Sequence, residues 1–118
     1  MMRFWPRKPR FPVIIDTGFE LVGAITGAEC SKRLARAKIV EEEQSKVVID
    51  VTAEGFGFYP KMMVITPMTI KKRWKKSEII ELYNSRRSPG APEYPSTSLG
   101  NKSVERVVSE IVYLLRQP

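Results

Sequence analysis

The sequence predicts an α+β fold, in which an antiparallel sheet of about four to six strands forms a meander and two C-terminal helices pack on one face. Short apolar segments separated by turn residues recur between residues 13 and 66, which is typical of neighbouring strands. Two segments with helical spacing of apolar residues follow residue 76. A chain of 118 residues with 42% apolar residues can bury one core, so we expect one domain over residues 12–118.

Residues 1–11 are expected to form an extended, mobile and basic arm in front of that domain. Prolines recur there with the three-residue period of a polyproline II helix, at Pro6, Pro9 and Pro12. Residues 13–16 then predict a short strand that ends at the turn signal Asp16-Thr17-Gly18. Residues 19–30 fit either a strand or a helix, and the sequence leaves that choice open.

A hairpin and two further strands are expected next. Residues 33–41 and 46–52 flank a polar stretch as the two arms of the hairpin. Residues 56–59 and 62–66 predict strand pieces that are interrupted at Pro60, because proline cannot donate to a ladder and marks a bulge or an edge.

Within residues 46–52, alternate side chains fall on opposite faces of the strand. Val47, Ile49 and Val51 share one face, and Val48, Asp50 and Thr52 share the other. Asp50 needs a cationic partner if it faces the interior, and it has little consequence if it faces solvent. Both alternatives remain open in the sequence.

Two helices close the chain. The first is expected to begin at Ser77 as N-cap, with Glu78 and Glu81 near its positive end, and to stop near Arg86-Arg87. The second has the i, i+3, i+4, i+7 pattern of an amphipathic helix, at Val104, Val107, Val108, Ile111, Val112 and Leu115. Between them, residues 88–100 form a Pro/Ser/Gly-rich loop longer than most connections in a compact domain.

Several classes of site are disfavoured by composition. Cys30 is the single cysteine and histidine is absent, so the common zinc sites, intramolecular disulfides and Ser-His or Cys-His arrangements are excluded. We therefore expect no metal and no cofactor, and we favour a non-enzymatic domain. The N-terminal residues lack the apolar core of a secretory signal, and no apolar run approaches the roughly 20 residues of a membrane helix, so a cytoplasmic protein is expected.

The surplus of positive charge is confined to two stretches of the chain. The net charge is +7, and outside residues 1–10 and 71–76 there are 11 basic and 13 acidic residues. Such a distribution is typical of a localised surface that attracts anions. The candidate anion-binding residues are Arg3, Arg7, Lys8, Arg10, Lys71, Lys72, Arg73, Trp74, Lys75 and Lys76.

The second stretch surrounds one large aromatic residue with five cations. Clustered cations suit a phosphate backbone, and the indole of Trp74 is able to stack on an unpaired base, so single-stranded nucleic acid or RNA is the favoured partner. The alternative is structural. Ile70 and Trp74 have the i, i+4 spacing of a core pair, with the lysines as a solvated face.

Residues 55–59, Gly-Phe-Gly-Phe-Tyr, resemble part of the RNP1 box of RNA-recognition motif domains, in which alternate aromatic side chains stack on bases. Glu54 stands where that box carries a cation, and Pro60 follows where the box continues. In the alternative interpretation, Phe56 and Phe58 point into the core, and Gly55 and Gly57 allow close approach on the other face.

Residues 13–18, Val-Ile-Ile-Asp-Thr-Gly, are similar to the signature of retroviral-type aspartic proteases. The resemblance implies that Asp16 pairs with the same residue of a second subunit and activates a water, a mechanism that needs no histidine. Alternatively, Asp16 caps a turn through bonds to its own backbone.

These observations lead to one main functional prediction and one alternative. The main prediction is a binding or accessory domain whose two basic stretches meet an anionic partner, with nucleic acid as the favoured partner. The alternative is a structural or protein-interaction domain that forms a homo-oligomer, with the arm strapped onto a neighbouring subunit.

Overall fold

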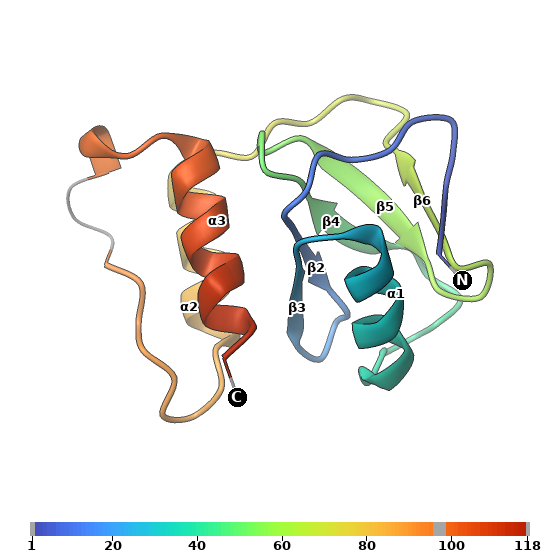
Figure 1. Ribbon diagram of the computed structural model, residues 1–118, viewed down its shortest axis with the longest axis horizontal. Coiled ribbons are helices and arrows are strands. Elements are labelled where there is room, and N and C mark those ends of the chain that lie inside the picture. Colours follow the sequence, from blue (N-terminus) through green and yellow to red (C-terminus); the bar gives the residue numbers. More distant parts are fainter. Residues whose placement is uncertain (1, 96–98, 118) are drawn as a thin grey trace.

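The structure is a computed structural model, and it describes residues 2–95 and 99–117. Six strands form one sheet: β1 (Arg3–Phe4), β2 (Val13–Asp16), β3 (Leu21–Ala24), β4 (Lys46–Ile49), β5 (Gly55–Tyr59) and β6 (Val64–Pro67). The helices are α1 (Gly27–Arg36), α2 (Lys76–Arg86) and α3 (Val104–Leu115), with a 3₁₀ turn η1 (Leu99–Asn101). The expected α+β class is therefore confirmed (Figure 1).

The strands lie in the order β1-β6-β5-β4-β2-β3. All neighbours are antiparallel except β1 and β6, and β4, β5 and β6 are adjacent in chain order, as in a meander. The two faces of the sheet bury separate groups of apolar side chains. Helices α2 and α3 lie side by side and cover one face at Ile14, Leu21 and Ile49 (Figure 1).

Helix α1 covers the opposite face, where Val13, Ile15, Val48, Phe56, Phe58 and Ile65 are buried. Thr26 caps this helix by accepting a hydrogen bond from the Glu29 amide, and Cys30 and Leu34 bury one side of it. The expected hairpin arm at residues 33–41 is therefore wrong. Residues 33–36 are the last turn of α1, and β4 instead pairs with β2 and β5.

The N-terminal arm is extended, and it is packed onto the sheet rather than projecting from it. The amides of Arg3 and Trp5 donate to the carbonyls of Met63 and Ile65 along β6. Met2 is buried, and its amide donates to Ser31 Oγ. The arm thus belongs to the same folded body as the rest of the described chain.

Strand β5 has two unlike faces. Phe56 and Phe58 are fully buried, so the expectation that they belong to the core is confirmed. On the other face, Gly55 permits the close approach of Trp74, because a Cβ there would lie 3.3 Å from the indole nitrogen. Pro60 lies in the turn after β5, and β6 begins two residues later than expected.

Both C-terminal helices form where helical spacing predicts them. Ser103 caps α3 by accepting from the Arg106 amide. Helix α2 begins at Lys76, and its first turn is closed by the Glu78 carboxylate, which accepts from the Lys75 amide; the expected N-cap at Ser77 is wrong. None of the helices in the described part of the chain has the length and apolar character needed to span a bilayer.

The long loop between α2 and α3 is tied down over residues 88–95, and residues 96–98 lie outside the described residues. The Tyr83 hydroxyl donates to the Pro92 carbonyl, and Asn84 exchanges two hydrogen bonds with the backbone of Tyr94. Tyr94 is buried, and its hydroxyl donates to Glu110 on α3 at 2.6 Å. Hydrogen bonds to α2 and to α3 therefore fix this part of the loop.

Candidate anion-binding surface

The turn between β4 and β5 organises the candidate surface. Asp50 is buried, and its carboxylate accepts from the amides of Arg10, Thr52 and Glu54 and from the Thr52 hydroxyl. The question left open by the sequence is thereby answered, because backbone amides rather than a cationic side chain compensate this buried charge. These bonds fix the path of residues 50–54.

The two basic stretches of the sequence dock on this turn from opposite sides. On the arm, the carbonyl of Arg10 accepts from the Val51 amide. On the segment before α2, the Lys72 carbonyl accepts from the Gly55 amide, and the Trp74 amide donates to the Ala53 carbonyl. Segments about sixty residues apart in the chain therefore meet at one place, at the top of Figure 1.

Glu54 lies between them. Its carboxylate accepts hydrogen bonds from the two terminal guanidinium nitrogens of Arg7, at 3.1 and 2.5 Å, and its side chain is only 7% exposed. The pKa of Glu54 is lowered, first by this hydrogen bond and then by the charges of Arg7, Lys71 and Arg73, against the opposing effect of burial. The two stretches thus share one buried carboxylate.

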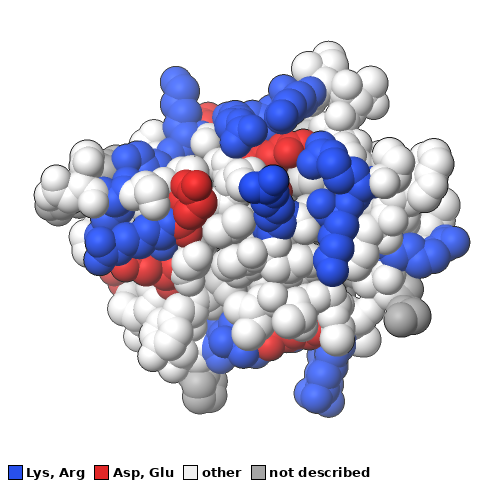
Figure 2. Space-filling model, turned by 45° about the horizontal axis from the view of Figure 1, so that its top comes forward, with Lys and Arg blue, Asp and Glu red and all other residues white. Residues whose placement is uncertain are grey.

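We call the exposed cations around this turn the basic rim: Arg7, Arg10, Lys71, Lys72 and Arg73. Both acids beside the rim, Asp50 and Glu54, are buried, whereas all five cations are exposed. Figure 2 shows this end of the molecule, with Lys and Arg side chains spread over it and fewer acidic ones between them. The exposed charge at the rim is therefore positive.

The other candidate cations lie away from the rim or are engaged elsewhere. Arg3 is on β1, and its guanidinium approaches the Met62 carbonyl at 3.4 Å. The ammonium of Lys8 lies over the rings of Phe4 and Phe11. Lys75 and Lys76 lie at the start of α2, where the Lys76 ammonium donates to the Lys102 carbonyl.

The aromatic residues near the rim differ in accessibility. Trp74 is half-buried against the α2/α3 core, and the Lys72 ammonium lies 4.3 Å from its ring. Its indole nitrogen is buried without a partner among the described residues. In contrast, Trp5 in the arm is 72% exposed. Sequence reasoning passed over Trp5, although an indole inside a basic segment is a recognisable signal for stacking.

Asp16 occupies a structural position. Its carboxylate accepts from the Gly18 amide, as in the turn alternative, and pairs with the Arg86 guanidinium at 2.5 Å. Thr17 is fully buried, and its hydroxyl donates to the Glu20 carbonyl. Both contacts of the Asp16 carboxylate lie within its own chain, as the turn alternative expects.

Over residues 2–95 and 99–117, no three acidic or cysteine side chains come together as a metal site would require. In comparisons with known protein families, with curated proteins and with solved structures, no match to this chain is found.

Proposed function

We propose that this protein is a small polyanion-binding domain that holds single-stranded nucleic acid along the basic rim. The observation that supports the proposal is the meeting of two basic segments around Glu54, with their cations exposed and the neighbouring acids buried. Phosphates one nucleotide apart are able to contact successive cations of such a rim, and each contact releases a counterion.

Recognition in this proposal rests mainly on the phosphate backbone. Phe56 and Phe58 are buried and offer no ring to a base. Trp5 is the exposed aromatic residue in the arm that carries part of the rim, and stacking of one base on its indole would add to the phosphate contacts. We therefore expect little dependence on base sequence.

The test is an anisotropy titration of a fluorescent single-stranded oligonucleotide at several salt concentrations. The double variant Lys71→Glu/Lys72→Glu is expected to bind about tenfold more weakly or worse at low salt. The slope of log affinity against log salt should fall by about 0.7 for each phosphate contact that is lost.

A matched control is the double variant Lys38→Glu/Lys61→Glu, which makes the same change in net charge at exposed lysines outside the rim. The two double variants are compared at about 0.1 M salt, where charges more than about 10 Å apart are screened, and the control should retain most of the affinity there. Absence of binding at low salt, or equal losses in the two double variants, would overturn the proposal.

A further inference from the structure

A second group of cations lines a hollow beside α1 and β3. This cavity, which we call the α1 pocket, has a volume of about 450 Å³ and lies between α1, β3 and the end of α3. That volume is in the range of sites for small molecules. Its charged lining residues are Glu20, Glu29, Lys32, Arg33 and Arg36, and its apolar ones include Leu21, Val22 and Leu115.

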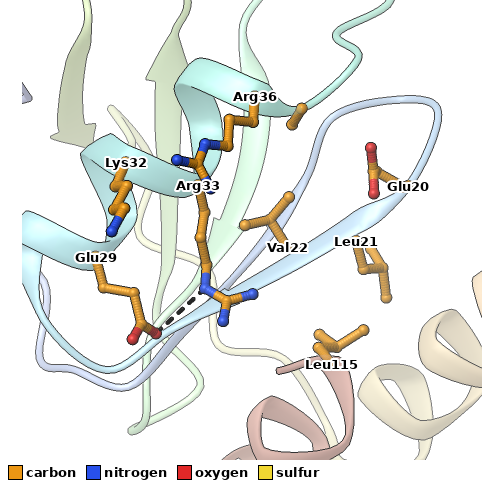
Figure 3. A pocket seen from close by; sticks show the side chains of 9 residues that line it. Glu20, Leu21, Val22, Glu29, Lys32, Arg33, Arg36 and Leu115 are labelled. Atoms are coloured by element: carbon orange, nitrogen blue, oxygen red, sulfur yellow. Dashed lines mark ion pairs between the residues drawn. The ribbon is translucent and has the colours of Figure 1, made fainter. Parts of the chain in front are cut away.

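Helical geometry brings the charged residues together. Glu29, Lys32, Arg33 and Arg36 have the spacing i, i+3, i+4, i+7, so they form one stripe along α1, while Cys30 and Leu34 are buried on another side. Figure 3 shows this stripe facing Leu21, Val22 and Leu115 across the pocket. One wall is therefore cationic, and the opposite wall is apolar.

Glu29, the acidic residue of the stripe, is paired with an arginine that lies outside the pocket lining. Arg116, at the end of α3, donates to both carboxylate oxygens of Glu29, at 2.7 and 2.9 Å. The pKa of Glu29 is lowered chiefly by this pair. Arg33 reaches the same carboxylate only through its Nε atom, at 3.5 Å, so its two terminal nitrogens are left for another acceptor (Figure 3).

Lys32 and Arg36 are exposed, and neither has an ion-pair or hydrogen-bond partner within the described ranges 2–95 and 99–117. Since Arg116 compensates Glu29, three cations in the pocket face the single remaining carboxylate of Glu20. The excess of two positive charges matches a phosphomonoester, which carries about −1.5 to −2 near pH 7.

We propose that the α1 pocket is a binding site for a small organic phosphomonoester. The phosphate lies against Lys32, Arg33 and Arg36, and the arginine forks contact its oxygens. The apolar or ring-bearing part of the molecule lies against Leu21, Val22 and Leu115. This site is separate from the basic rim and does not depend on nucleic-acid binding.

The experiment is a titration of the full chain followed by NMR chemical shifts, with phenyl phosphate, inorganic phosphate and phenol as separate probes. Phenyl phosphate is expected to bind most tightly, because it alone contacts both walls, and the shifts should map to α1 and β3. Equal affinity for phenyl phosphate and inorganic phosphate, or shifts that map elsewhere, would overturn the proposal.

Two variants test the named cations. Lys32→Glu should weaken phenyl phosphate binding about tenfold, because it replaces an attractive charge by a repulsive one. Arg33→Lys keeps the positive charge but removes the guanidinium group that donates two parallel hydrogen bonds. It should therefore weaken binding by a smaller factor, about threefold. The control Lys61→Glu makes the same charge change as Lys32→Glu at an exposed lysine outside the pocket. Equal effects of Lys32→Glu and Lys61→Glu would rule out the site.

Discussion

Glu54 and Glu29 each accept two hydrogen bonds from the guanidinium group of an arginine in a distant part of the chain, yet the cations around them are arranged differently. Around Glu54, the cations come from two extended segments and are exposed along a rim. Around Glu29, they come from one helix and line a hollow with an apolar wall. The same kind of arginine–carboxylate tie therefore supports a surface suited to a long polyanion in one place and a pocket suited to a small anion in the other.

The largest expected effect is a separation of the two binding activities. Lys71→Glu/Lys72→Glu should lower oligonucleotide affinity about tenfold or more. It should change phenyl phosphate affinity by no more than about twofold, because salt screens the charges of one site from the other. Lys32→Glu should do the reverse. Both titrations are to be run on each variant. If each variant loses both binding activities, the rim and the α1 pocket are not separate sites.

The dependence of stability on pH compares Glu54 and Glu29 with a third carboxylate, Glu110. The pKa of Glu110 is lowered to about 2, first by the hydrogen bond from Lys102, then by those from Tyr94 and Arg106. Because its folded pKa lies below the ordinary 4.5, its contribution to stability is full above about pH 4.5 and is lost as the pH falls toward 2. Glu54 and Glu29 act in the same direction.

Urea unfolding between pH 7 and 2 measures this contribution. The free energy of unfolding should fall below about pH 4.5, and Glu110→Gln should flatten that fall because it removes the titrating group. Glu81→Gln changes an exposed glutamate on α2 and serves as the control. An unchanged slope in Glu110→Gln would contradict the assignment of the low pKa to this cluster.

Replacing each tied carboxylate by its amide sharpens the comparison between rim and pocket. Glu54→Gln and Glu29→Gln should each lower the free energy of unfolding by about 1 kcal/mol, because a charge-assisted hydrogen bond becomes a neutral one. Only Glu54→Gln should also raise oligonucleotide affinity, since it removes a negative charge beside the basic rim. Denaturant titrations and anisotropy measure the two effects, and an equal gain of affinity in both variants would contradict the separation.

The smallest expected effect concerns Cys30, which reports on the packing of α1. The thiol is fully buried, and burial, followed by the charge of Glu29, raises its pKa to about 12. Labelling with iodoacetamide at pH 8 should therefore be slow, and Arg116→Ala should accelerate it a few-fold by loosening the tie between α1 and α3. Arg106→Ala, which alters an exposed pair on α3, should not. Equal rates in these two variants would show that Arg116 does not hold α1.

Local patterns were sufficient for some elements and misleading for one. The buried side of α3 and the shared face of Phe56 and Phe58 follow from side-chain periodicity alone, and burial shows that this face is the inner one. Residues 36–39 alternate polar and apolar as in a strand, which favoured the wrong prediction. In the structure, Cys30 and Leu34, at i and i+4, are instead the buried residues of helix α1. This misassignment also hid the α1 pocket, because a strand over residues 33–41 would place Arg33 and Arg36 on opposite faces.

For the rim, the sequence predicted which cations are concentrated but not where they meet. That depends on hydrogen bonds from the turn at residues 50–54 to two remote segments, which no local pattern encodes. Glu54 was noticed only as a departure from the RNP1 box. Its position between Arg7 and Arg73 is a product of tertiary structure.

The short pairing of β1 with β6 covers the edge of the sheet. Without it, β6 would be the last strand of the sheet, and the carbonyls of Met63 and Ile65 would lose the amides of Arg3 and Trp5. An uncovered strand of this kind is a template for pairing with another chain. A shortened protein that lacks the arm would thus gain a tendency to self-associate while losing cations, so single substitutions at Arg7 or Arg10 separate the two effects where truncation would merge them.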